Sequence, residues 1–171
     1  MQSKKGAIEL SITTIIVVVI GVTLLIFGLV FVRGVFEKVT TLTEDAFRAA
    51  EKEVQQRMGA SDKIYVSGVN FEVESGKSTV FTVGVQNFGE ETTVSKFKID
   101  IVPGDTKIKK DEWFTLPPED NLKPGDKKGF PVKVTLPKGA PPGKSYTFTI
   151  RVFKNNEEYA SQAIIVSVKE S

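Results

Sequence analysis

The sequence ITTIIVVVIGVTLLIFGLVFV, residues 12–32, decides what kind of protein this chain can be. Sixteen of its 21 residues are Ile, Val, Leu or Phe, and none is charged. Each of these apolar residues favours lipid by roughly 0.3–0.6 kcal/mol at a helix centre. At about 1.5 Å per residue the run is about 30 Å long, which matches the hydrocarbon core of a bilayer. We therefore predict a single membrane-spanning helix over residues 12–32.

The composition argues against several classes of function. The net charge is +2, so a polyanionic partner such as nucleic acid is not expected. The 171 residues include no cysteine and no histidine. This rules out disulfides, thiol nucleophiles, zinc sites of the usual kind and histidine-based acid–base catalysis. We expect no cofactor, no metal site and no enzymatic activity.

Basic residues before the apolar run set the expected orientation. Lys4 and Lys5 precede it, and positive residues stay on the cytoplasmic side of a membrane. This predicts an N-terminus inside the cell and a single-pass protein with its bulk outside. A plain signal anchor is one interpretation and a cleaved secretory signal is another. The second fits poorly, because the run exceeds an h-region of about 7–15 residues and no A-x-A-like site follows it.

The run KKGAIE, residues 4–9, resembles the class III signal peptide of archaeal type IV pilins and archaellins. This resemblance covers about the first 33 residues. It implies that a prepilin peptidase cleaves between Gly6 and Ala7, so that residues 1–6 form a leader peptide. In many type IV pilins the conserved acid is fifth in the mature chain, whereas Glu9 is third counted from Ala7. The resemblance implies that Glu9 pairs with a neighbouring subunit's N-terminal amine. The alternative is a first-turn acid that favours the helix dipole by about 0.3–1 kcal/mol.

The helix is expected to continue beyond the membrane. Gly21 and Gly28 lie seven residues apart on nearly one face, where small residues let helices approach closely, although glycine is also common in membrane helices. After residue 34 an apolar stripe recurs at spacings of 3 and 4: Val35, Val39, Leu42, Ala46, Ala50, Val54 and Met58. No proline interrupts residues 12–58, and Gly59 is a natural stop. We predict one long helix over residues 7–59, as in a type IV pilin, with the head, another helix or the membrane surface covering its stripe.

The remaining residues, 62–169, change to a period of two. Apolar and polar residues alternate at 81–85, 97–101, 130–136, 146–152 and 164–168. An opening strand near 64–74 changes parity at Ser67-Gly68, which predicts a β-bulge. A shorter strand contains Trp113 and Phe114. Gly- and Pro-rich turns separate the runs. About seven strands predict an antiparallel immunoglobulin-like β-sandwich, so the fold class is α+β.

Two segments of this domain carry a second, looser resemblance. Residues 121–126 (NLKPGD) and 141–146 (PPGKSY), each followed by a strand, look like the closing half of Ig-like modules on prokaryotic surface proteins. Acidic pairs such as Glu119-Asp120 lie in loops and lack the spacing of a dedicated calcium loop. We interpret them, and the lysines near residues 107–110 and 127–128, as solvated or edge-protecting residues.

These features lead to two hypotheses. The first is a structural subunit of an archaeal type IV pilus-like surface filament, used in a task such as adhesion. Its N-terminal helices would form the core and its β heads the outer surface, with copies of itself, the membrane, a prepilin peptidase and the pilus assembly machinery as partners. The alternative is a single-pass, membrane-anchored Ig-like module that binds a surface-layer protein or a protein of the archaellum or pilus machinery.

Overall fold

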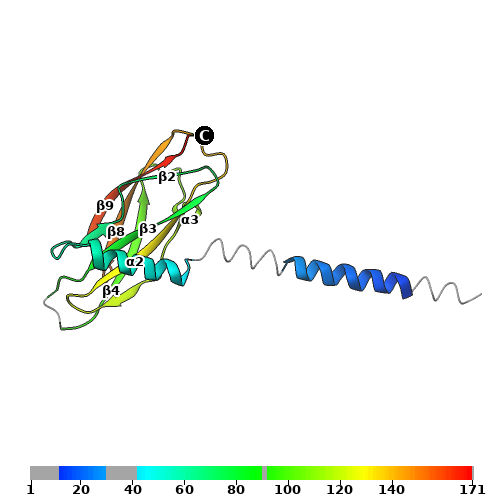
Figure 1. The fold of residues 1–171 in the computed structure, drawn as a ribbon, viewed down its shortest axis with the longest axis horizontal. Helices are drawn as coiled ribbons and strands as arrows, with labels where there is room; N and C mark the ends of the chain where they lie inside the picture. Colours follow the sequence, from blue (N-terminus) through cyan, green and yellow to red (C-terminus); the bar gives the residue numbers. More distant parts are fainter. Residues whose placement is uncertain (1–11, 30–41, 90–91, 171) are drawn as a thin grey trace, which may run out of the picture. The chain divides into compact units, whose positions relative to one another are not determined.

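The structure, a computed structural model, describes residues 12–29, 42–89 and 92–170. The chain falls into two units, Met1–Thr41 and Leu42–Ser171. In the first, all the described residues, Ile12–Leu29, are helical, in agreement with the predicted apolar helix (Figure 1). The end of the predicted span, residues 30–32, lies outside the described residues.

The amphipathic segment forms a helix of its own, α2 (Glu44–Arg57). Thr43 is its N-cap, with an extended backbone (φ −81°, ψ 157°), and its hydroxyl accepts a hydrogen bond from the Ala46 N–H at 3.3 Å. Because Leu42 and Thr43 are not helical, the prediction of one continuous helix over residues 7–59 is wrong. A threonine hydroxyl can accept a hydrogen bond from one of the first backbone N–H groups of a helix, and Thr43 therefore favours a helix that begins at the next residue. The second unit begins at Leu42, so it contains α2 as well as the predicted head, residues 62–169.

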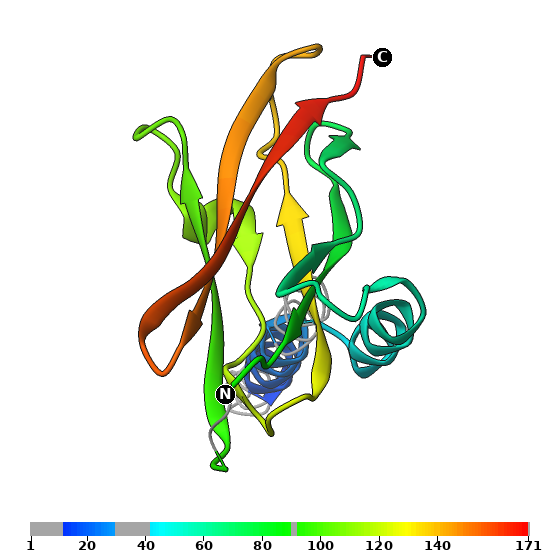
Figure 2. The same cartoon turned by 90° about the vertical axis from the view of Figure 1, so that its left-hand side faces the viewer.

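The head unit, Leu42–Ser171, contains two sheets that confirm the predicted sandwich (Figures 1 and 2). Sheet A contains, in spatial order, β1 (Ile64–Val66), β3 (Ser78–Gln86), β7 (Lys127–Thr135) and β5 (Phe114–Thr115). Sheet B contains β2 (Asn70–Val73), β9 (Glu157–Val168), β8 (Ser145–Lys154), β4 (Ser95–Pro103) and β6 (Asp120–Leu122). The described residues thus form nine strands, not seven, and every pair is antiparallel except the parallel pair β2–β9.

The parity change at Ser67-Gly68 marks a change of sheet, and the predicted β-bulge there is wrong. Ile64 pairs with Val85 in sheet A, whereas Phe71 pairs with Val166 in sheet B. The inward direction reverses when the chain crosses from one sheet to the other. The apolar residues on each side of the crossing therefore fall out of phase, although both sets face the interior.

A second crossing closes the other side of the sandwich. The chain passes from β5, at one end of sheet A, to β6, at one end of sheet B, through Pro117-Pro118. The first crossing likewise joins β1 to β2, the opposite ends of the two sheets. All four end strands are short, with two to four residues each. Each end strand therefore pairs with only two to four residues of its longer neighbour, and the rest of that neighbour's edge has no strand partner among the described residues.

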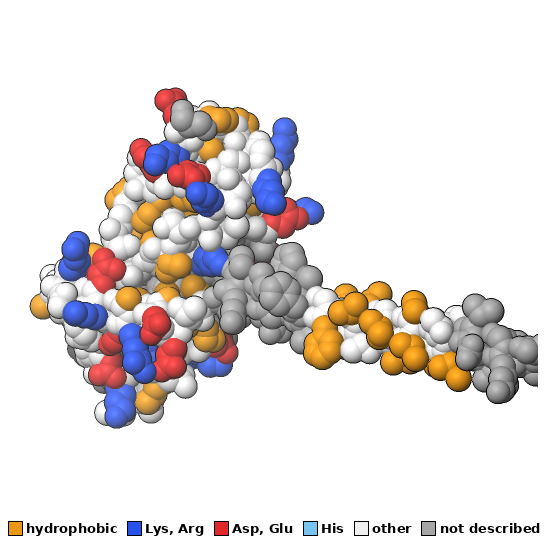
Figure 3. Space-filling view, turned by 45° about the vertical axis from the view of Figure 1, so that its right-hand side comes forward, with side chains coloured by type: hydrophobic (Ala, Val, Ile, Leu, Met, Phe, Trp, Pro, Cys, Tyr) orange, Lys and Arg blue, Asp and Glu red, His pale blue; other side chains and the backbone are white. Residues whose placement is uncertain are grey.

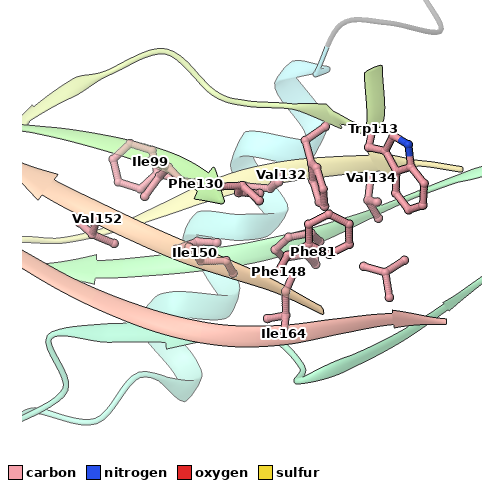
Figure 4. Packing of buried hydrophobic residues seen from close by; sticks show 14 of the residues in the cluster. Phe81, Ile99, Trp113, Phe130, Val132, Val134, Phe148, Ile150, Val152 and Ile164 are labelled. Atoms are coloured by element: carbon pink, nitrogen blue, oxygen red, sulfur yellow. The ribbon is translucent and has the colours of Figure 1, made fainter. Parts of the chain in front are cut away.

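Aromatic rings fill the core between the sheets (Figure 4). Trp113 and Phe114 both pack on Phe148, with ring centroids 5.6 Å and 4.8 Å apart. Trp113 is buried, but it ends the short helix α3 (Lys110–Trp113) and does not belong to the strand predicted there. The turn between β8 and β9 consists of Asn155 and Asn156, both with positive φ (50° and 72°), which suits a tight two-residue hairpin.

The alternation of buried and exposed residues holds for sheet B but not for the centre of sheet A. Residues 81–86 of β3 and 129–134 of β7 are all buried. The second face of these strands is covered by α2, which contacts β7 and β3 (Figure 2). The prediction that one face of each of these strands lies in water is therefore wrong for β3 and β7.

Candidate functional site

None of the described residues of the apolar helix is buried, and Figure 3 shows hydrophobic side chains along the side of it that faces the viewer. Its large side chains are all more than half exposed, from 51% for Ile12 to 67% for Phe27. The Thr23 hydroxyl donates to the Val19 carbonyl at 2.7 Å, so this polar group is satisfied inside the helix. A helix of 18 described residues, about 27 Å long, can cross a membrane by its length and composition.

The predicted assembly glycines lie on this exposed surface. A Cβ atom built on Gly21 or Gly28 would have no atom of the chain within 4 Å. Both positions are therefore free to contact another helix, and their role in assembly stays a prediction. The predicted processing residues Lys4, Lys5, Gly6 and Ala7, together with Glu9, lie outside the described residues.

In the head unit, two glycines form a seat for α2 on sheet A. Gly84 of β3 and Gly129 of β7 are directly opposite each other in the sheet. A Cβ on Gly84 would lie 2.7 Å from Val54 Cγ2, and one on Gly129 would overlap the backbone carbonyl of Ala50. The side chains of Ala50 and Val54 are buried as a result. Glycine inside a strand often marks a position where another backbone approaches closely. Gly84 and Gly129 are therefore the signal in the sequence that corresponds to this seat.

Hydrogen bonds hold α2 on this seat. A Glu51 carboxylate oxygen accepts from the Gly129 N–H at 3.0 Å, and Lys127 Nζ donates to the Met58 carbonyl at 2.9 Å. The Tyr65 hydroxyl donates to a Glu53 carboxylate oxygen at 3.1 Å. Burial, and then this hydrogen bond, raise the pKa of Tyr65 above its usual value. The stripe predicted along residues 46–58 thus has its partner within the same chain, the head.

The Glu51 contact also closes an open strand edge. β5 pairs only with Lys133 and Val134, so the first half of β7 has no neighbour on that side. The Asp126 carbonyl accepts from the Asn87 N–H and the Leu136 N–H donates to the Lys77 carbonyl, so the backbone groups of the even-numbered residues of β7 face β3. The N–H and C=O groups of the odd-numbered residues therefore point away from β3. Of these, the Gly129 N–H is taken by Glu51, and Pro131 has no N–H. The edge therefore offers few free donors to a foreign strand.

The acidic loop residues form ion pairs. Lys96 Nζ lies 2.8 Å from Glu119 Oε1, and Lys128 pairs with Asp120. The hydrogen bond from Lys96 lowers the pKa of Glu119, and the bond from Lys128 lowers that of Asp120. The described residues contain no group of three or more acidic side chains placed to hold a metal ion.

A hollow lies between α2 and β7. Its lining includes Phe47, Glu51, Lys128 and Gly129. Glu51 is bonded to Gly129, and Lys128 to Asp120. The described residues that line the hollow include no pairing of a nucleophile with a base.

The outer face of sheet B differs from that of sheet A, because no described element covers it. Its centre is formed by five uncharged side chains, which we call the outer patch: Val102, Thr147, Thr149, Ala163 and Ile165. Val102 and Ile165 are 39% and 38% exposed. The sequence pattern placed Thr147, Thr149 and Ile165 on the outer side of their strands and did not predict that the five residues would form one uncharged surface.

No family model matches this sequence, and no curated protein matches it. The similar solved structures include the YadV chaperone (16% identity, 64% of this chain and 53% of that chain, TM-score 0.41) and the periplasmic chaperone SfaE (13%, 63% and 57%, 0.40). A FixG-related protein from Vibrio parahaemolyticus is also similar (11%, 64% and 99%, 0.42). The chain spans about half the length of these chaperones. At such low identities and TM-scores, these similarities support no conclusion about function.

Proposed function

We propose that this chain is a subunit of an archaeal type IV pilus-like surface filament. Its apolar helix would join the helices of other copies in the core, and its sandwich would face outward. The observation that carries the proposal is the apolar helix Ile12–Leu29, whose large side chains are each more than half exposed. Such a surface requires either lipid or other apolar helices around it.

The sequence before the helix supports the filament over a simple anchor. KKGAIE, residues 4–9, resembles a class III signal, and processing between Gly6 and Ala7 would leave the apolar helix near the new N-terminus. The helix would then exchange lipid contacts for helix contacts, with Gly21 and Gly28 as candidate points of close approach. The proposal includes no catalytic step and no cofactor.

A second candidate is the membrane-anchored Ig-like module that binds a surface-layer protein or a machinery protein. The start of α2 at Thr43 favours it, because a pilin-like rod would continue without a break into its amphipathic half. In this candidate, α2 belongs to the head and the apolar helix serves as an anchor.

The mass of the native protein distinguishes the two candidates. A filament subunit is expected in sheared surface material with Ala7 as its first residue. An anchored module is expected in the membrane fraction with residues 1–6 retained. As a control, replacing Gly6 by valine should block processing and remove the protein from the sheared fraction. Recovery of the unaltered protein in the membrane fraction only, with Met1 as its first residue, would refute the filament.

A further inference from the structure

Part of β9 has no strand beside it on the side away from β8. β2 pairs only with the last residues of β9, Ile165 to Val168. The Ile165 N–H donates to the Val69 carbonyl, so the backbone groups of the odd-numbered residues in this part of β9 point away from β8. The groups of Ser161 and Ala163 point the same way, but they lie before β2 begins. Among the described residues they have no hydrogen-bond partner.

The sequence of this stretch does not block a neighbouring strand. Residues 160–163, which we call the free edge, read ASQA and contain neither a charge nor a proline. Charged residues and prolines are common protections of edge strands. The open edge of β7 has both, in Glu51 and Pro131, and β4 is contacted by α3. An extended backbone is the ligand whose N–H and C=O groups match the unpaired groups of Ser161 and Ala163.

We propose that the free edge of β9 pairs in the antiparallel direction with the free edge of a second copy of this chain. The edge is complementary to itself, and this selects the occupant. With Gln162 on the two-fold axis, Ser161 of each copy lies opposite Ala163 of the other, and each such pair exchanges two N–H···O bonds. All the unpaired groups of Ser161 and Ala163 are satisfied in this register.

The side chains of β9 permit this register. Ser161 and Ala163, which would face each other, are small, uncharged and exposed. Gln162, which would face its own copy, has an amide that both donates and accepts hydrogen bonds. Glu157 and Glu158 would fall opposite positions 167 and 166, which are a serine and a valine, so no like charges meet.

The contact is short, because structure limits it at both ends. β2 occupies the side of β9 from residue 165 onward, and a register shift at Val152 and Phe153 makes β9 irregular just before Ala160. Such a bulge bends a strand and ends regular pairing. The area buried is well below the roughly 800 Å² per partner of a stable interface, so we expect a weak, reversible dimer.

Hydrogen exchange of the full-length protein in detergent tests the contact directly. When the protein concentration is raised, we expect exchange at the Ser161 and Ala163 amides to slow roughly tenfold or more. The Gln162 amide faces β8 and should be protected at every concentration. The Val80 amide faces the open side of β3 and should exchange rapidly at every concentration. Exchange at Ser161 and Ala163 that does not depend on concentration would overturn the inference.

A proline on the free edge removes a donor that has no partner within the chain. Ser161→Pro should raise the dissociation constant of the dimer roughly tenfold or more, because the dimer loses two hydrogen bonds. Val80→Pro is the matched control, since it removes an outward N–H from β3 in the other sheet, where Lys77 and its ion-pair partner Glu74 flank the edge. This variant should leave association unchanged. Sedimentation in detergent measures both constants.

Urea unfolding checks that these variants fold. Ser161→Lys, which places two like charges diagonally across the axis, provides a second variant if the proline disrupts the strand. A Ser161 variant that folds and dimerises normally, or equal weakening by Val80→Pro, would overturn the inference.

The inference goes beyond the proposed function and holds for a filament subunit or an anchored module. Filaments that begin at Ala7, with no protection at Ser161 and Ala163, would refute the pairing and leave the filament standing. Protection at these two amides in a chain that keeps residues 1–6 and stays in the membrane fraction would refute the filament and leave the pairing standing.

Discussion

Gly84 and Gly129 allow the head to pack as it does because neither has a side chain. They lie opposite each other in sheet A and let α2 approach the sheet at backbone distance. The two sites differ in what an added methyl group would meet. At Gly84 it would meet the Val54 side chain, which can be shortened, whereas at Gly129 it would meet the Ala50 backbone, which cannot.

We therefore expect Gly84→Ala and Gly129→Ala each to lower the free energy of unfolding by about 1–3 kcal/mol through overpacking. Val54→Ala should partly rescue Gly84→Ala, with a coupling of about 1 kcal/mol, because it removes the Cγ2 atom in conflict. The same Val54→Ala change should not rescue Gly129→Ala. Urea unfolding of the single and double variants measures both couplings, and equal couplings would contradict this account of the seat.

Tyr65 makes the stability of the head depend on pH in the alkaline range. Burial and the Glu53 hydrogen bond raise its folded-state pKa above 10.0, where the unfolded chain loses this proton. Its contribution to stability is thus complete below pH 10 and falls as the pH rises through the folded-state pKa. Tyr65→Phe should remove the part of the alkaline loss of stability that comes from ionisation of Tyr65. Urea unfolding at several pH values above neutrality measures it, and identical pH profiles for the two proteins would refute this assignment.

At the scale of elements, α2 acts as a cover for both a face and an edge of sheet A. It buries the outer side of β3 and β7, and its Glu51 caps the Gly129 N–H on the open edge of β7. The two crossings, β1 to β2 and β5 to β6, close the sides of the sandwich. The Glu51 cap reduces the number of free donors that the open edge of β7 presents to a foreign strand.

Removal of the Glu51 acceptor should open that edge. We expect Glu51→Ala to speed hydrogen exchange at the Gly129 amide by about 10- to 100-fold, because a hydrogen bond to a charged group contributes about 1.5–3 kcal/mol. Glu51→Gln keeps an acceptor oxygen and should have a smaller effect. The Phe130 amide, which faces β3, serves as the internal control. Equal acceleration at both amides would indicate general loosening of the head and not a local cap.

At the scale of the whole molecule, the apolar helix Ile12–Leu29 is long and apolar enough to cross a membrane. An arginine at its centre costs roughly 2.5–3.5 kcal/mol on insertion. We therefore expect Val19→Arg to lower the membrane-bound fraction of the full-length chain. Val80→Arg adds the same charge to the exposed surface of the head and should leave partitioning unchanged. Carbonate extraction of membranes measures the fraction, and unaltered retention of Val19→Arg would argue against a membrane-spanning role.

The sequence alone determined the two kinds of structure in this chain. An uncharged run as long as a bilayer is thick specifies a helix, and alternation at 81–85, 97–101 and 164–168 specifies strands, because both patterns are local and repeat with the backbone. The start of a second helix at Thr43 was not predicted, although a threonine followed by two acids is a recognisable N-terminal signal.

The tertiary structure alone decided how these pieces meet. Residues 64–73 show a parity change in sequence, but only the pairing of Ile64 with Val85 and Phe71 with Val166 shows that the chain changes sheets. Likewise, Gly84 and Gly129 lie 45 residues apart, and only their registration across β3 and β7 makes them one seat for α2. Local periodicity fixes which face of an element is apolar. Which surface covers that face depends on contacts between residues distant in sequence, and no local pattern encodes them.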